Sequence, residues 1–535
     1  MRILIIGGVA GGASAAARAR RLSETAEITI IERGPDVSFA NCGLPYHIGG
    51  EITERSDLAI QTPESLSKLL NLEVLTRTEA IAIDRISKSV TVRDLETGDE
   101  SRLSYDKLVL SPGAKPLVPQ ITGIDFPEVH SLRTLQDMDR IETDLKSAKD
   151  VLIIGGGFIG LEMAEQIHHL GCTTTLVERN RQVLTPLDPE LAKDLASTFE
   201  SKGVRLHFSE NLISIEQGPT AVFASGLRLK TDLIILSIGV VPENALAEDC
   251  GLALGDRGHI RVNEYQQTSD ENIYAAGDVV ETSDSILGGY RPLALGGPAN
   301  RQGRTIADHM FRGDEALPYP GSIGTANVRV FETTAALTGY GEEFLRKQDV
   351  PFQSVTINAA SHADYYPGAE TIKLKVLWSP EDGRILGAQA VGRDGVDKRI
   401  DVLATAIRGK MTVEDLCHLE LCYAPPFGSA KDPVNIAGFA ACNLREGLLK
   451  PKYGLPDGRA IVVDVRPAAK AKSQPVPGAI NIPLPELRSR LGEIDSTQPV
   501  FAICQMGKTS YFAARILQQN GFDAHSIIGG AHLNL

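Results

Sequence analysis

Residues 150–178 read "DVLIIGGGFIGLEMAEQIHHLGCTTTLVE", and this stretch decides the fold. A continuous apolar run, typical of a strand buried on both faces, leads into a glycine turn, a helical stretch and a second strand. Gly155, Gly157 and Gly160 match the spacing G-x-G-x-x-G, and Glu178 ends the second strand. Such a unit brings a helix N-terminus to a pyrophosphate, and its carboxylate accepts ribose hydroxyls. The alternative is a glycine turn without a ligand.

A similar unit occupies residues 3–32, where "ILIIGG" leads through a small-residue helix to a strand that ends at Glu32. Gly7 and Gly12 hold the outer glycine positions, but Val9 stands in the middle one. Further along, "IYAAGD" ends a strand at Asp278, whose carboxylate can reach a hydroxyl of a bound nucleotide. Two such units in one chain predict two dinucleotide sites.

The bulk composition narrows the classes of partner. The chain has 535 residues, too many for one core, and its net charge is −14. This charge argues against nucleic acid or an anionic membrane as a partner. No apolar run approaches the roughly 20 residues of a membrane span. The seven cysteines are scattered without a CxxC pair, which predicts a cytoplasmic protein without a disulfide framework and without a metal site.

The pattern of apolar and polar residues changes after the second unit. Residues 322–445 contain "TANVRVFETTAALTGYG", "TIKLKVLW" and "ILGAQAVG", which predict an antiparallel sheet followed by helices. A segment of mixed Gly, Pro and Lys at 446–456 predicts a linker, and strands and helices alternate again over 457–535. The fold class is therefore α/β, with two Rossmann-like dinucleotide-binding domains, an α+β domain and a C-terminal α/β domain.

The order of these parts resembles the flavin-dependent pyridine nucleotide disulfide oxidoreductases. The resemblance implies an FAD-binding domain at 1–115 and 245–321, an NAD(P)H-binding domain at 116–244, and a dimerisation domain at 322–445 that forms a homodimer. Glu178 would repel a 2′-phosphate, which favours NADH, but the neighbouring Arg179 and Arg181 leave NADPH open.

The resemblance also implies the residues that contact each cofactor. For FAD they are Gly7, Val9, Ala10, Gly12, Glu32, Arg33, Ser111, Pro112, Gly113, Gly277, Asp278, Leu295 and Ala299. For the nicotinamide cofactor they are Gly155, Gly157, Phe158, Ile159, Gly160, Glu178 and Gly239.

Cys42, in "SFANCG", has no second cysteine near it, so its redox partner must be external. The sulfur either cycles through a sulfenic acid or forms a mixed disulfide with a small thiol. Relatives that use a sulfenic acid carry a histidine in the first glycine loop, where this chain has Ala10. We expect a lowered thiol pKa at Cys42, because the residue is placed at the start of a helix and beside the flavin.

"SFANCG" is also similar to the coenzyme A disulfide reductases, which bind coenzyme A in a channel leading to the cysteine. The implied coenzyme A contacts are Ser14, Arg18, Arg21, Ser38, Asn41, Lys68, Asn300, Arg304 and Lys431. For each arginine, the alternative is a solvated helix face.

The same resemblance implies that Tyr365 and Tyr423 reach the partner subunit's cysteine across the dimer interface. A phenol there can protonate a leaving thiolate, whereas the alternative is a packing role for both rings. We interpret the nearby Cys417 and Cys422 as structural.

Residues 457–535 resemble a rhodanese domain in "VVDVRP", "PGAINIP" and "ICQMGKTS". Cys504 would begin the active loop and carry sulfane sulfur, stabilised by backbone N–H groups. Thr509 replaces an arginine that is often seen in such loops, so anion binding would rest on Lys508. The alternative is a degenerate module used only for docking.

Together these features predict an FAD-dependent NAD(P)H oxidoreductase that reduces the sulfur–sulfur bond of coenzyme A disulfide, coenzyme A persulfide or polysulfide. Coenzyme A is either the substrate or a bound cofactor. One alternative is an NADH oxidase or peroxidase that reduces oxygen or peroxide. A second is a redox-responsive binding protein that holds both cofactors and signals through its interface.

Overall fold

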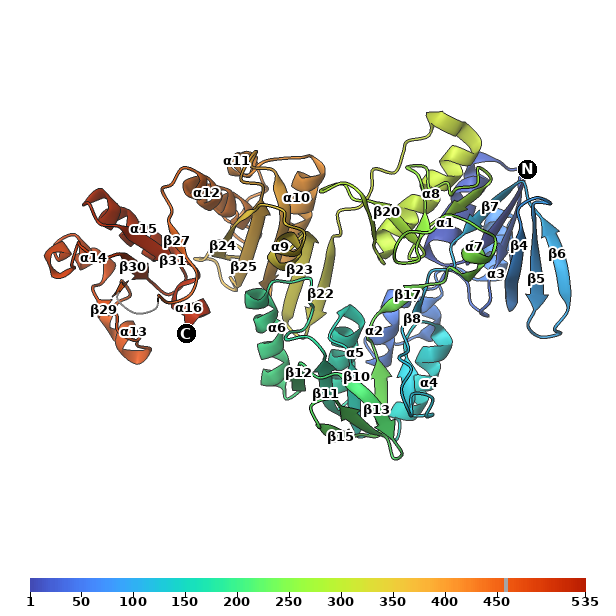
Figure 1. Cartoon of the computed structure of the whole chain (residues 1–535), viewed down its shortest axis with the longest axis horizontal. Coiled ribbons are helices and arrows are strands. Elements are labelled where there is room, and N and C mark those ends of the chain that lie inside the picture. The colour runs from blue at the N-terminus through green and yellow to red at the C-terminus, as the bar shows by residue number, and fades with distance from the viewer. Residues whose placement is uncertain (457–459) are drawn as a thin grey trace. The chain divides into compact units, whose positions relative to one another are not determined.

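The structure is a computed structural model that describes residues 1–456 and 460–535, except for the side chains of 532 and 533. The expected start of the last domain, residue 457, lies outside the described residues. The chain forms two compact units, Met1–Val183 with Phe199–Gly324, and Leu184–Thr198 with Thr325–Leu535 (Figure 1). Within the described residues, none of the helices combines the length and apolar character of a membrane span.

The first sheet of the first unit is built on the N-terminal apolar run. Its five parallel strands have the order β19 (Ile273–Ala275), β7 (Lys107–Leu110), β1 (Arg2–Ile6), β2 (Glu27–Ile31) and β3 (Glu73–Leu75). Ile3, Ile5 and Ile30 are buried, which explains the unbroken apolar runs. Because β19 pairs with β7, residues far apart in the chain share this sheet, as a discontinuous domain requires.

The second sheet repeats this arrangement. Its parallel strands have the order β12 (Arg205–Phe208), β11 (Thr173–Glu178), β10 (Asp150–Ile154), β16 (Leu233–Leu236) and β9 (Val129–Ser131). Both predicted dinucleotide-binding folds are therefore confirmed as parallel sheets, each with a glycine loop after its central strand.

Helices and short sheets complete the nucleotide-binding domains. The helices are α1 (Ala10–Leu22), α2 (Leu44–Ile48), α3 (Pro63–Leu70), α4 (Leu135–Leu145), α5 (Phe158–His169), α6 (Pro189–Lys202), α7 (Ala245–Asp249) and α8 (Gly296–Arg312), with 3-10 turns η1 (Asn41–Gly43), η2 (Arg55–Leu58) and η3 (Gly313–Glu315). The short sheets contain β4 (Thr78–Asp84), β5 (Ser89–Asp94) and β6 (Glu100–Ser104); β13 (Leu212–Glu216), β14 (Thr220–Phe223) and β15 (Arg228–Lys230); β8 (Ala114–Pro116) and β17 (Val240–Pro242); and β18 (Ile260–Arg261), β20 (Val280–Ser283) and β21 (Tyr290–Pro292).

The second unit contains the predicted antiparallel sheet. Its order is β22 (Ala326–Val330), β23 (Thr333–Gly339), β26 (Ile385–Gly392), β25 (Thr371–Trp378) and β24 (Gln353–Ala360). The helices of this part are α9 (Glu342–Lys347), α10 (Val396–Arg408), α11 (Val413–Cys417) and α12 (Pro433–Arg445). Trp378, the single tryptophan of the chain, is fully buried on β25.

The C-terminal domain is a five-stranded parallel sheet. Its order is β27 (Pro451–Lys452), β31 (Ala524–Ile527), β30 (Val500–Ile503), β28 (Ile461–Asp464) and β29 (Ile480–Asn481). Its helices are α13 (Ala468–Ser473), α14 (Leu484–Leu487), α15 (Lys508–Gln519) and α16 (Gly530–Asn534), with the 3-10 turn η4 (Leu491–Glu493). Pro451 and Lys452 lie in the expected linker but form β27, so part of that segment belongs to this sheet.

A buried lysine holds part of the second unit together. The Lys375 ammonium, 3% exposed, lies 2.8 Å from Asp188, 2.5 Å from Glu190 and 2.8 Å from Glu342. Burial opposes ionisation of the Glu342 carboxyl, but Lys375 outweighs this effect and lowers its pKa to about 2. Lys375 therefore supplies the counter-charge of the buried Asp188 carboxylate, whereas Glu342 also pairs with Arg346 at 2.6 Å.

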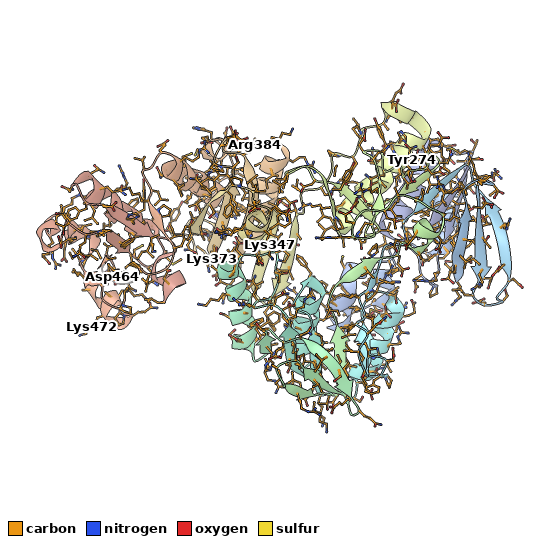
Figure 2. All side chains as sticks on the ribbon, in the orientation of Figure 1. Tyr274, Lys347, Lys373, Arg384, Asp464 and Lys472 are labelled. Carbon is orange, nitrogen blue, oxygen red and sulfur yellow. The ribbon has the colours of Figure 1, made fainter. Side chains whose placement is uncertain are left out.

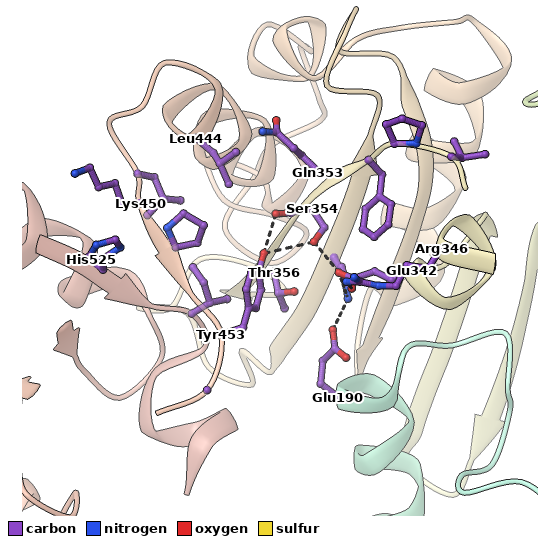
Figure 3. A pocket seen from close by; sticks show the side chains of 18 of the residues that line it. Glu190, Glu342, Arg346, Gln353, Ser354, Thr356, Leu444, Lys450, Tyr453 and His525 are labelled. Carbon is purple, nitrogen blue, oxygen red and sulfur yellow. Dashed lines mark hydrogen bonds and ion pairs between the residues drawn. The ribbon is translucent and has the colours of Figure 1, made fainter. Parts of the chain in front are cut away.

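The same group of side chains holds the start of the C-terminal domain. Tyr453 donates a hydrogen bond to the Ser354 carbonyl at 3.0 Å, and the Ser354 hydroxyl donates to Glu342 at 2.7 Å (Figure 3). These residues line a pocket of about 1090 Å³ between β24 and the segment around β27. None of the candidate cofactor or catalytic residues lines this pocket, so we assign it a structural role.

We predict that Lys375→Met lowers the free energy of unfolding of this part of the chain by about 3–5 kcal/mol near neutral pH, because it removes the cation that faces the buried Asp188 carboxylate. The contribution from Glu342 is present above its unfolded pKa of about 4.3 and is lost as the pH falls toward about 2. The defect should therefore shrink in acid. Urea unfolding followed by Trp378 fluorescence measures it, because Trp378 lies on the same strand.

The matched control is Lys347→Met, which breaks the exposed pair with Glu343 (Figure 2). It should change the free energy of unfolding by less than about 1 kcal/mol. Equal effects of the two substitutions would show that the buried carboxylates do not depend on Lys375.

Candidate active site

The second glycine loop, between β10 and α5, has the geometry that a pyrophosphate needs. Gly155 has φ +110°, and a Cβ there would lie 2.3 Å from the Ser237 carbonyl oxygen. A Cβ at Gly160 would lie 1.9 Å from the Gly155 carbonyl oxygen, so only glycine fits either position. No side chain of the described residues caps α5 at Gly157, which leaves its first N–H groups directed at a ligand.

The first glycine loop, between β1 and α1, repeats this geometry although Val9 replaces the middle glycine. Val9 is the N-cap residue of α1, again without a side-chain cap among the described residues. Glu32 accepts a hydrogen bond from the Gly8 N–H at 2.9 Å, as Glu178 does from the Gly156 N–H at 2.7 Å. Both loops therefore fit a dinucleotide, and both acidic residues lie beside the phosphate-binding turn.

Segments distant in sequence meet beside the first loop. A Cβ on Gly277 would lie 3.7 Å from the Ser111 hydroxyl and 3.7 Å from the Ala299 methyl group, so three of the expected FAD segments converge. Arg133 donates to the Pro112 carbonyl at 2.8 Å. Burial raises the pKa of the Asp278 carboxyl, and the positive charge of Arg133 opposes this shift.

The remaining expected cofactor residues lie at the edges of these loops. Arg33 is exposed and its guanidinium lies 3.7 Å from Glu243, which also lies 3.5 Å from Arg133. Leu295 is the N-cap residue of α8, and Gly239 follows β16 with φ +119°. Gly113, Phe158 and Ile159 belong to the turns themselves, and Ala10 begins α1.

Cys42 lies in a segment that is attached to the first glycine loop. It forms η1 with its neighbours immediately before α2, as the sequence predicted, and its loop is tied to the first glycine loop by a hydrogen bond from the Ser38 N–H to the Gly8 carbonyl at 2.8 Å. Ser38 has φ +50°, a left-handed conformation that favours glycine and costs on the order of 1 kcal/mol. The chain therefore holds the cysteine segment in place at some energetic cost.

The expectation of a lowered pKa at Cys42 is wrong for the charges that the chain itself supplies. Although the residue is exposed, partial burial of its thiol raises the pKa, and the negative charges of Glu162 and Asp278 raise it further. The short helix α2 does not offset these effects. Glu162 lies on α5 and Asp278 follows β19, so the thiol is within electrostatic range of both nucleotide-binding domains.

Four of the expected coenzyme A residues form one face on the packed helices α1 and α8. Ser14 donates to Asn300 at 2.6 Å, while Arg18 and Arg304 both approach Asp308, at 2.5 and 3.6 Å. Arg18 is thus already paired, and Arg304 is 64% exposed.

The other expected coenzyme A residues lie elsewhere in the structure. Ser38 and Asn41 flank Cys42, and Arg21 and Lys68 are exposed near the ends of α1 and α3. Lys431 belongs to the second unit, directly before α12.

Tyr365 and Tyr423 are brought together in the second unit. Their hydroxyl groups lie 3.0 Å apart, and both side chains are exposed. The hydrogen bond with Tyr423 raises the pKa of the Tyr365 phenol, so Tyr365 keeps its proton at neutral pH. A neutral phenol at a surface can donate a proton to an incoming group.

Cys504 follows β30 and is buried at 2% exposure. Its sulfur accepts a hydrogen bond from the Gly507 N–H at 3.1 Å and donates to the Ser510 hydroxyl at 3.4 Å. The loop is held from outside by Asn358, which donates to the Met506 carbonyl at 3.2 Å. Lys508 and Thr509 are exposed at the start of α15.

Sequence reasoning missed Glu162, Asn358 and Ser510. The position of Ser510 in the first turn after the Cys504 loop was a usable signal, because a hydroxyl there can reach a thiol. Glu162 and Asn358 gave no local signal, since their contacts depend on how α2 packs on α5 and how β24 meets the Cys504 loop.

We predict that Glu162→Gln lowers the thiol pKa of Cys42, because it removes one negative charge near the sulfur. More thiolate is then present at neutral pH, so alkylation of Cys42 by iodoacetamide should become faster and its pH profile should move toward lower pH. Peptide mapping after timed alkylation measures this rate. Glu64→Gln, an exposed change on α3, is the control, and an unchanged profile in Glu162→Gln would contradict the prediction.

Family models match nearly the whole chain. Residues 1–301 match the pyridine nucleotide-disulphide oxidoreductase model, and 325–433 match the dimerisation domain of the same family. Residues 452–532 match the rhodanese-like domain.

Individual relatives agree with these matches. A coenzyme A disulfide reductase of Staphylococcus haemolyticus is 36% identical over 447 residues, which cover 83% of this chain and 100% of that protein. The solved structure of reduced Bacillus anthracis CoADR-RHD has a TM-score of 0.96 at 43% identity and covers 99% of this chain and 97% of its own. A NAD-dependent persulfide reductase from A. fulgidus has a TM-score of 0.95 at 37% identity, with 100% of both chains covered.

The fold, the two nucleotide loops with a single cysteine between them, and these matches agree. The chain belongs to the pyridine nucleotide-disulphide oxidoreductase family, and it is an enzyme that uses FAD and NAD(H) and carries a C-terminal rhodanese-like domain.

Proposed function

We propose that this enzyme reduces the sulfur–sulfur bond of coenzyme A disulfide, coenzyme A persulfide or a related polysulfide through Cys42. The observation that carries the proposal is the place of Cys42, a lone thiol within electrostatic range of Asp278 on one side and Glu162 on the other. A thiol at this junction can receive electrons that pass between the two nucleotide sites. Because it has no cysteine partner in its own segment, it exchanges with an external sulfur compound.

The first glycine loop favours sulfur over oxygen as the acceptor. Ala10 begins α1 and offers no proton donor to an oxidised sulfur, so a sulfenic acid on Cys42 would gain no stabilisation from that position. The relatives that cover this chain from end to end include one named for persulfide reduction, and they share its rhodanese-like domain.

The proposed reaction conserves atoms and electrons. The Cys42 thiolate attacks one sulfur of R–S–S–R′, forms a mixed disulfide Cys42–S–S–R and releases R′–S⁻. FAD and NADH, held at the first and second glycine loops, would supply the two electrons that cleave this bond. Cleavage returns Cys42 to its thiolate, and one proton converts the second leaving group into a thiol. With a persulfide R–S–SH the products are a thiol and sulfide.

We propose that the face formed by Ser14, Arg18, Asn300 and Arg304 binds coenzyme A. Arg304 supplies an exposed guanidinium suited to a phosphate group, and Ser14 and Asn300 supply hydrogen-bonding groups beside it. Ser38 and Asn41 then flank the thiol arm at Cys42. Arg21, Lys68 and Lys431 remain proposed contacts of the same ligand.

We further propose that the chain acts as a homodimer, in which Tyr365 and Tyr423 of one subunit protonate the thiolate that leaves the partner's cysteine. Their paired hydroxyls and exposure support this role. Apart from β27, which places Pro451 and Lys452 in the C-terminal sheet, the domain limits given in the sequence analysis remain a proposal. The cytoplasmic location is also proposed, and the seven free cysteines support it.

Cys504 is the proposed carrier of sulfane sulfur. A persulfide on this residue keeps the hydrogen bond from the Gly507 N–H, and the Ser510 hydroxyl can turn to donate to a sulfur anion. A coenzyme A thiol could accept the terminal sulfur and carry it to Cys42.

Steady-state NADH oxidation with coenzyme A disulfide, coenzyme A persulfide and oxygen as separate acceptors tests the proposal. We predict that kcat/KM is at least about 100-fold higher for a sulfur acceptor than for oxygen. Cys42→Ser should lower turnover of both sulfur acceptors by about 10³-fold or more, because it removes the attacking atom.

Cys504→Ser serves as the internal control, since it should leave coenzyme A disulfide reduction unchanged and slow only the use of polysulfide. A higher kcat/KM for oxygen would support the NADH oxidase alternative. Normal binding of both cofactors without turnover of any acceptor would support a redox-responsive binding protein.

A further inference from the structure

A pair of sulfur atoms lies where α11 packs on α12, apart from Cys42 and Cys504. The Sγ atoms of Cys417, at the end of α11, and Cys442, on α12, are 3.3 Å apart. Both residues are half-buried free thiols. The sequence interpretation of Cys417 as merely structural did not foresee this neighbour, because 25 positions separate the two residues.

The packing of the two helices holds the sulfurs at this distance. A Cβ on Gly438 would lie 2.9 Å from the Cys417 backbone nitrogen, so the missing side chain allows α12 to approach α11 closely. Asn435 donates to the carbonyls of Leu416 at 2.9 Å and Leu419 at 3.0 Å, which fixes the end of α11 against α12. A disulfide has a sulfur–sulfur distance of about 2.05 Å, so the two sulfurs need to approach each other by only about 1.2 Å.

The surroundings disfavour the charged form of one thiol. Burial raises the pKa of Cys442 to about 12, and the contact with Cys417 and the charges of Glu414 and Glu446 add to the shift. Cys442 therefore keeps its proton at neutral pH, and the first attack on an external disulfide falls to Cys417. A disulfide between the two residues carries no thiol proton, so no thiolate charge has to be placed in this half-buried site.

We propose that Cys417 and Cys442 form a second, reversible dithiol–disulfide couple that small disulfides oxidise. The Cys417 thiolate attacks R–S–S–R and releases one R–S⁻, which leaves a mixed disulfide on Cys417. Cys442 gives its proton to solvent, attacks the Cys417 sulfur and releases the second R–S⁻. Two electrons pass from the cysteines to the small disulfide, which leaves as two thiols, and an excess of small thiol reverses the step.

The couple brackets a segment of the proposed active site. Residues 418–441 lie between the two cysteines and carry Tyr423 and Lys431. The segment is already anchored near α12, where Asp432 pairs with Arg399 at 2.9 Å. A covalent bond at its two ends disfavours local opening mainly of the part from 418 to 431, so the couple links the sulfur redox state to the local stability of the segment that carries Tyr423.

Thiol mapping of the full-length holoenzyme tests the couple. The reduced protein is incubated anaerobically with glutathione disulfide, quenched in acid, alkylated and digested without reductant. We expect a cross-linked peptide pair containing Cys417 and Cys442, about 2 Da lighter than the two reduced peptides together. Alkylation of both residues should fall by about tenfold or more and recover after an excess of reduced glutathione.

Cys172 and Cys250 are matched controls, since both are half-buried and their thiols donate hydrogen bonds to the backbone carbonyls of Ala148 and Ala247. They should stay open to alkylation. The proposal is overturned if Cys417 and Cys442 are alkylated as fully as these controls, or if each carries glutathione separately. In Cys442→Ser, Cys417 should stop at the mixed disulfide with glutathione. In Cys42→Ser, the cross-link between Cys417 and Cys442 should still form, which separates this couple from the proposed reductase activity.

Hydrogen exchange tests the second half of the proposal. Amides from 418 to 431 should exchange more slowly in the oxidised protein, whereas α10 should not change. A cross-link without slower exchange would refute the link to Tyr423 while leaving the couple itself in place.

Discussion

The Cys42 segment is pinned to the first glycine loop by the hydrogen bond from the Ser38 N–H to the Gly8 carbonyl, and the active site depends on this constraint. Only glycine fits Gly7 and Gly12 in this loop, because β-carbons there would lie 2.2 Å from the Ser111 carbonyl oxygen and 1.9 Å from the Gly7 carbonyl oxygen. The left-handed conformation of Ser38 is a local cost of this attachment. The attachment places the Cys42 thiol beside a turn that can hold a dinucleotide, which is the geometry that a redox-active cysteine requires.

The surroundings of the Cys42 thiol favour its protonated form. Asp278 and Glu162 both raise the pKa of Cys42, so the chain alone does not present a reactive thiolate to every small molecule in solution. A thiol of high pKa is a stronger nucleophile once it is deprotonated. Activation of the Cys42 thiol therefore requires the enzyme with its cofactors bound. The cationic residues on α1 and α8 attract the anionic substrate toward Cys42.

Much of the fold was predictable because its signals are local. Two apolar runs that end in glycine predicted both parallel sheets, and "SFANCG" predicted the place of Cys42 at the start of α2. The wrong expectation about the pKa of Cys42 has a physical reason, since Glu162 is 120 positions away and reaches the thiol only through the packing of α2 on α5.

Other features were hidden for the same reason. Lys375 meets Asp188 and Glu190, which lie far away in sequence, and Cys417 meets Cys442 only because Gly438 lets two helices approach. Pro451 and Lys452 gave a linker signal by composition, yet an edge strand tolerates proline, and they pair with β31. The residue types thus predicted the helices, the strands and the candidate site residues. Long-range packing determined the ion pairs and the pKa shifts.

The most direct measurement of the central claim is the location of the coenzyme A adduct after a single half-reaction. The oxidised holoenzyme is mixed with coenzyme A disulfide in the absence of NADH, and intact mass and peptide mapping follow the adduct. The account predicts one coenzyme A per chain, disulfide-linked to Cys42, which is released as free thiol when NADH is added. An adduct found only on other cysteines, or one on Cys42 that NADH cannot remove, would contradict it.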